Sequence, residues 1–208
     1  MVRSAEVMHA YLIDQVNLML RRLEMYGGEP ALWTLFDHLF FLEDADNGVA
    51  DLHESWRARN AFTPTGVQGA LKRHLPEGLR SALPSMYAEA ARQRGWLRVD
   101  RALTSAEHTT LCGSVESFVT TNRTLADVLD AFGQPSALFG GTNPRCEKTL
   151  AYATDNKSDP MVFFHLWNSR DEYTEPILLA IRHGAGPFAA SFAFTPEGIR
   201  RRPTEDES

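Results

Sequence analysis

The residues from Arg123 to Pro196 decide the fold, because they contain one helix signal followed by a series of strand signals. They begin RTLADVLDAFGQPSALFG (123–140), in which an apolar stripe at helical spacing follows Thr124 and Asp127. A threonine followed three residues later by an acid is the capping-box signature, and Gly133 stands where the stripe ends. The sequence therefore predicts a helix between Thr124 and Gly133.

Strand signals take over after this helix. The run MVFFHLW (161–167) is apolar on both faces, which is typical of a central strand that is covered on each side. In FAASFAFT (188–195), Phe188, Phe192 and Phe194 share one face with Ala190, as in a half-buried strand. Short connections rich in Asp, Asn, Gly and Pro favour antiparallel neighbours. We expect strands at residues 136–139, 148–154, 161–167, 177–183 and 188–195.

The first 120 residues are predicted to be mostly helical, because their apolar residues recur at helical spacing between glycines and prolines. The fold class is therefore α+β, with a helical N-terminal half packed on an antiparallel β-meander of four to five strands and one preceding helix. Residues 1–120 and 121–199 have no long linker between them and should form one continuous domain. We expect the charged tail, 200–208, to be disordered. The expected helices span residues 5–25, 30–43, 49–56, 65–75, 84–94 and 105–120.

Composition restricts the compartment and the partners. The 208 residues are 43% hydrophobic and 23% charged, as in an ordinary globular protein. The formal net charge of −6 disfavours nucleic acid, which usually meets a basic surface. Only two cysteines are present, Cys112 and Cys146, and no apolar run approaches the ~18 residues of a membrane span. With no secretory-type apolar segment among residues 1–25, we expect a cytoplasmic protein without a membrane partner.

Motifs for cofactors and metals are incomplete. The loop from Gly140 to Asn143 resembles a phosphate loop in its glycines, but Glu147 stands where a glycine must precede Lys148, and the lysine opens a strand. None of the seven histidines forms a metal-ligating pair, and the acidic run near Gly48 lacks calcium-loop spacing. We therefore expect neither a cofactor nor a metal ion.

The segments Leu125–Ser136 and Phe139–Pro144 are similar to the helix, FGxPS turn and strand meander of small bacterial immunity proteins of toxin systems, of an actinobacterial type. The similarity covers about a third of the chain and leaves the helical N-terminal half unexplained. It implies a non-enzymatic protein that binds a protein partner, such as a basic toxin domain. Acidic charge fits this interpretation, because opposite fields accelerate association. An alternative hypothesis is a regulatory or scaffold module that forms a homodimer through its helical half.

Two sets of residues follow from these hypotheses. For binding, two acidic segments are candidates, and both are equally compatible with ordinary solvated loops. For an enzyme, a site at the mouth of the sheet would have to bring together residues that are distant in sequence. The candidate binding residues are Glu43, Asp44, Asp46, Asp51, Asp171, Glu172 and Glu175, and the alternative catalytic residues are His165, Cys146, Asn143 and Arg145.

Overall fold

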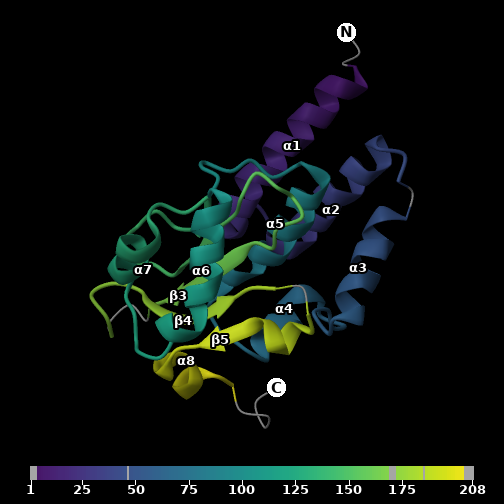
Figure 1. Cartoon of the computed structure of the whole chain (residues 1–208). Helices are drawn as coiled ribbons and strands as arrows, with labels where there is room; N and C mark the ends of the chain where they lie inside the picture. Colours follow the sequence, from purple (N-terminus) through teal and green to yellow (C-terminus); the bar gives the residue numbers. More distant parts are fainter. Residues whose placement is uncertain (1–3, 46, 169–171, 185, 204–208) are drawn as a thin grey trace.

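The computed structural model describes residues 4–45, 47–168, 172–184 and 186–203 of the chain (Figure 1). Helices fill most of the sequence before the sheet, and two short 3-10 helices, η1 and η2, join them. The elements are α1 (Ala5–Arg21), η1 (Leu23–Met25), α2 (Gly28–Leu42), α3 (Gly48–Ala58), α4 (Gly66–Lys72), η2 (Arg80–Ala82), α5 (Leu83–Arg94), α6 (Ser105–Phe118) and α7 (Leu125–Phe132).

The sheet is an antiparallel meander whose strands lie in the order of the sequence, β1-β2-β3-β4-β5. This arrangement confirms the α+β fold class and the central position of β3. The pairing of β3 with β4 shifts between His165 and Leu166. The strands are β1 (Ala137–Gly140), β2 (Lys148–Tyr152), β3 (Val162–Trp167), β4 (Ile177–Arg182) and β5 (Phe192–Phe194), and helix α8 (Pro196–Arg201) follows them.

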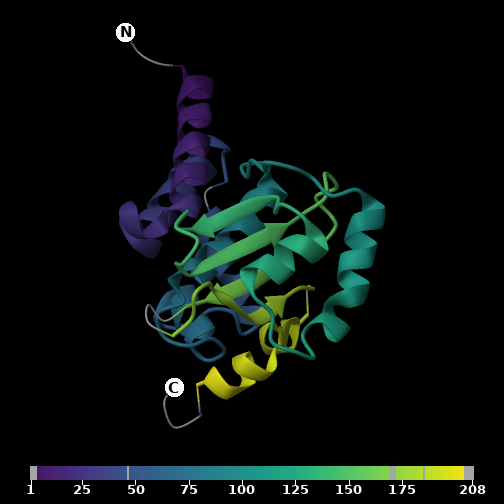
Figure 2. The ribbon, with the colours of Figure 1, turned by 90° about the vertical axis from the view of Figure 1, so that its left-hand side faces the viewer.

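Helices cover both faces of the sheet (Figure 2). On one face Phe163 packs in a large core with Phe36 and Tyr87, which come from the N-terminal helices. On the other face Phe164 packs with residues of α6 and α7, including Val115 and Val128. Because consecutive residues of a strand point to opposite faces, the apolar run of β3 supplies both cores.

Local signals explain where these helices begin. The side chains of Thr124 and Asp127 form the predicted capping box at α7, and Thr104 and Glu107 form a second one at α6. The helix predicted for residues 5–25 ends at Arg21 and continues as η1.

Two predictions near the C-terminus are wrong. The strand expected at 188–195 starts only at Phe192, because Phe188–Ser191 forms the 3-10 helix η3 after Pro187. Ala190 donates its N–H to the carbonyl of Pro187 at 3.0 Å, which curls the chain instead of extending it. The tail expected to be disordered from residue 200 is helical through Arg201, since α8 runs from Pro196 to Arg201. Residues 204–208 lie outside the described residues.

Candidate functional site

A groove of about 850 Å³ opens where the C-terminal end of α1 meets η2 and the β1–β2 loop. Four segments that are distant in sequence form its walls, so that only the folded chain can create it. Its lining carries three arginines and two carboxyl groups. We call it the arginine groove, and it is lined by residues 22–25, 78, 80, 81, 84, 140, 141, 143, 145–147, 167 and 168.

The β1–β2 loop is held in place by a buried ammonium group. Lys148 donates from Nζ to the carbonyl of Asn143 at 2.7 Å, and the Asn143 side chain accepts the N–H of Arg145 at 3.0 Å. Gly140 adopts a φ of 104°, and a Cβ there would lie 3.0 Å from the carbonyl oxygen of Glu147. Gly140 and Lys148 therefore shape this wall of the groove. Lys148 begins strand β2, whereas the lysine of a phosphate loop stands at the start of a helix.

Glu147 lies on the same wall and is partly buried. Its Oε1 accepts the N–H of Arg80 at 3.1 Å, and its Oε2 has no hydrogen-bond partner among the described residues. Burial, with a contribution from nearby Glu24, raises the pKa of Glu147 to about 7. This carboxyl group therefore keeps its proton to a higher pH than an exposed glutamate does.

Three of the four alternative catalytic residues line the arginine groove: Asn143, Arg145 and Cys146. The fourth, His165, is 0% exposed and lies on the face of β3 that packs against the N-terminal helices. Its Nδ1 lies 3.0 Å from the hydroxyl of Thr149, and burial holds its pKa well below the ordinary histidine value. No histidine is among the residues that line the groove beside Cys146. The structure does not bring His165 and Cys146 together.

Arg182 is a buried polar residue that the sequence did not point out. It is 0% exposed, donates to Glu89 at 2.9 Å and to the hydroxyl of Ser85 at 3.0 Å, and lies over the ring of Phe163. These contacts tie β4 to α5. A buried guanidinium needs such partners, so its role is structural.

A cysteine–histidine contact on α6 was also missed. Cys112 and His108 are four residues apart on one helix, and a search for i, i+4 pairs would have found them. The Cys112 sulfur lies 3.7 Å from Nε2 and 3.9 Å from Nδ1 of His108, a placement beside the ring and not in line with one nitrogen. Burial raises the pKa of the Cys112 thiol, and Nε2 lies 2.9 Å from the carbonyl of Pro160. The pair is therefore unsuited to forming a thiolate.

The acidic candidates do not lie on one surface. Glu43, at the end of α2, accepts from the indole of Trp96 at 2.6 Å and contacts His9 at 2.9 Å, so it joins α1, α2 and the segment after α5. Asp44 and Asp51 are exposed nearby. The connection between β3 and β4 lies at another end of the molecule in both views (Figures 1 and 2). Asp46 and Asp171 lie outside the described residues.

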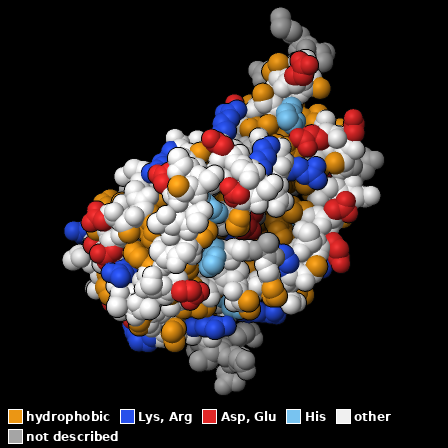
Figure 3. Space-filling model, viewed as in Figure 1, with side chains coloured by type: hydrophobic (Ala, Val, Ile, Leu, Met, Phe, Trp, Pro, Cys, Tyr) orange, Lys and Arg blue, Asp and Glu red, His pale blue; other side chains and the backbone are white. Residues whose placement is uncertain are grey.

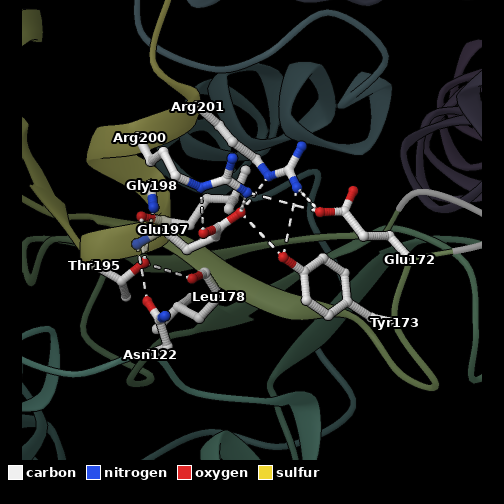
Figure 4. Close-up of polar contacts among 10 residues, drawn as sticks. Asn122, Glu172, Tyr173, Leu178, Thr195, Glu197, Gly198, Arg200 and Arg201 are labelled. Atoms are coloured by element: carbon white, nitrogen blue, oxygen red, sulfur yellow. Dashed lines mark hydrogen bonds and ion pairs between the residues drawn. The ribbon is translucent and has the colours of Figure 1, made fainter.

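In the β3–β4 connection, the two described acids have partners within the chain. Glu175 accepts the N–H of Ala126 at 3.1 Å, at the first turn of α7. Glu172 pairs with Arg201, which also contacts Glu197 and the hydroxyl of Tyr173 (Figure 4). These ion pairs fix α8 against the connection, so that both acids already serve the fold.

The described residues add two observations about metals and membranes. Within those ranges, no three His, Cys, Asp or Glu side chains gather as a set of metal ligands. None of the described helices has the length and apolar character required to cross a bilayer. Comparison with known proteins found no matching protein-family model, no matching curated protein and no matching solved structure.

Proposed function

We propose that this chain is a cytoplasmic, non-enzymatic protein-binding protein, of which an immunity protein that neutralises a basic toxin domain is the most concrete form. One observation carries the proposal: large apolar side chains are exposed on α1 and at the end of α2, in the part of the molecule where α1 projects from the body. Phe41 at the end of α2 is 73% exposed, and on α1 Val7 and Tyr11 are 50% and 47% exposed. We call this set the projecting surface.

The geometry of α1 and α2 supports this proposal. The N-terminal part of α1 extends beyond the rest of the molecule (Figures 1 and 2), and hydrophobic side chains are exposed there among both acidic and basic ones (Figure 3). The contact of His9 with Glu43 places this end of α1 beside the end of α2. Aromatic side chains are common anchors of protein interfaces.

Acidic residues lie on the same two helices as these apolar side chains, and one of them, Asp14, is paired with Arg98. Glu6 and Asp14 are exposed on α1, Asp37 is exposed one turn before Phe41, and Asp44 follows α2. An apolar centre with a charged rim is the common anatomy of an interface. A negative rim favours a basic partner and speeds its association, in keeping with the net charge of −6.

The test is calorimetric titration of the purified chain with each basic protein domain encoded beside its gene. A partner should bind, and the double substitution Phe41→Ser with Tyr11→Ser should weaken binding by about tenfold or more, as expected for interface anchors. The matched control is Ile199→Ser, because Ile199 is 66% exposed on α8, outside the projecting surface. The proposal fails if none of these domains binds, or if the control weakens binding as much as the double variant.

A further inference from the structure

The arginine groove lies at the opposite end of α1 from the projecting surface, and it has a different chemistry. In the described part of the chain, five buried side-chain polar atoms lack a hydrogen-bond partner. Three of them belong to residues that line this groove: Ser81 Oγ, Glu147 Oε2 and Asn168 Oδ1. Ser81 is only 5% exposed. Buried polar atoms in folded proteins are nearly always paired with protein atoms or ordered water, so a cluster of unpaired ones at one groove calls for partners from outside the chain.

The charges around the groove are the second observation. Arg22 follows α1, Arg80 begins η2, and Arg145 lies in the β1–β2 loop, so each guanidinium comes from a different segment. Arg80 pairs with Glu24 at 3.2 Å, whereas no described carboxylate pairs with Arg22 or Arg145. Three cations around one groove stand out on a chain whose net charge is −6. Guanidinium groups bind carboxylates through paired hydrogen bonds, so the groove favours an anionic ligand.

The unpaired atoms narrow the class of anion. Glu147 Oε2 in its ionised form and Asn168 Oδ1 are acceptors, so they need a ligand that supplies N–H donors. A peptide offers a carboxylate and backbone N–H groups a few ångströms apart. The volume of about 850 Å³ is in the range of pockets that hold small ligands, and Trp167 is among the lining residues.

We propose that the arginine groove binds a short peptide segment that carries a carboxylate, with the carboxylate at Arg22 and Arg145 and backbone N–H groups directed to Glu147 and Asn168. The carboxylate belongs either to the C-terminus of the peptide or to an acidic side chain. The hydroxyl of Ser81 pairs with the same ligand. This site is independent of the projecting surface, so either can be present without the other.

The experiment is an NMR titration of the full, ¹⁵N-labelled chain with three synthetic probes. They are acetyl-tetra-alanine with a free carboxylate, the same peptide as its amide, and a doubly capped tetrapeptide with one internal glutamate. We expect saturable shifts of the Cys146 and Trp167 signals with at least one acidic probe, and binding of the neutral amide weaker by about tenfold or more. Whichever acidic probe binds more tightly identifies the source of the carboxylate.

Matched variants test the residues. The double variant Arg22→Gln with Arg145→Gln should lower the affinity for the acidic probes by about tenfold. Arg57→Gln on α3, outside the groove, should leave that affinity unchanged. Because Ser81 Oγ makes no hydrogen bond to a described residue, Ser81→Ala should leave the thermal midpoint unchanged and weaken binding several-fold. The spectrum of each variant shows directly whether it is folded.

Three results would overturn the proposal. The first is that none of the probes gives saturable shifts, and the second is that the neutral amide binds as tightly as the acidic peptides. The third is that inorganic phosphate, titrated alone, binds as tightly as the peptides and loses affinity in the same variants. That result would mean that the groove recognises a bare anion and makes no use of N–H donors.

Discussion

At the scale of single residues, the buried carboxyl group of Glu147 in the arginine groove should make the free energy of unfolding depend on pH. Burial raises its pKa from an ordinary 4.5 to about 7, so the native state binds a proton that the unfolded state has already released between these pH values. The contribution of Glu147 to the free energy of unfolding therefore falls as pH rises through this window. Because a glutamine side chain cannot ionise, Glu147→Gln should stabilise the protein at pH 8 relative to pH 4.5 by up to about 3 kcal/mol, measured against wild type by urea denaturation.

Glu77→Gln is the control for this measurement. Glu77 is exposed and, among the described residues, is paired with Lys72 at 3.1 Å, and a surface pair of this kind contributes about 0–1 kcal/mol. Its substitution should have nearly the same small effect at both pH values. A Glu147→Gln effect that is equally independent of pH would contradict the burial argument.

Single residues also show why the candidate sites were only partly predictable. The apolar run around His165 predicts a strand that is covered on both faces, but it does not show which residues cover His165. Glu43 looks like a free acid in sequence, yet its main partner, Trp96, is 53 residues away. The arginine groove depends on contacts among four such distant segments, and no pattern in a single sequence records these contacts.

At the scale of elements, regular patterns were predictable and turns were not. The capping box at Thr124 and the apolar run of β3 are local signals, and both led to the correct element. Phe188–Ser191 alternates like a strand, but Pro187 and the hydroxyl of Ser191, which donates to the carbonyl of Phe188 at 2.6 Å, favour a 3-10 turn. The apolar stripe of α6 predicts that one side of the helix is buried. It does not show which face of the sheet the helix covers.

The close packing of α8 on β4 leads to a prediction about stability. Gly198 lies so close to β4 that a Cβ would stand 1.9 Å from the carbonyl oxygen of Leu179. Gly198→Ala should therefore lift α8 from the sheet and destabilise the protein by about 1–3 kcal/mol, the usual range for overpacking. Gly113→Ala is the control with the opposite sign, because a Cβ there meets open space on α6 and should stabilise by about 0.5–1 kcal/mol. Equal midpoints of thermal unfolding for the two variants would contradict this account.

At the scale of the whole molecule, the two cores on the faces of the sheet should unfold together, as one domain. Leu178 and Leu179 are neighbours on β4, both fully buried, and they face opposite cores. All four tryptophans, Trp33, Trp56, Trp96 and Trp167, lie in or against the core that contains Leu179.

This distribution makes tryptophan fluorescence a reporter of one face only, while circular dichroism reports on both. Leu178→Ala and Leu179→Ala should each destabilise by about 2–5 kcal/mol, as large-to-small core substitutions do. If the sheet couples its two faces, Leu178→Ala must shift the fluorescence and circular dichroism transitions to the same urea midpoint, although no tryptophan lies in its core. Separate midpoints in that variant would instead mean that α6 and α7 can leave the sheet while the N-terminal helices stay packed on it.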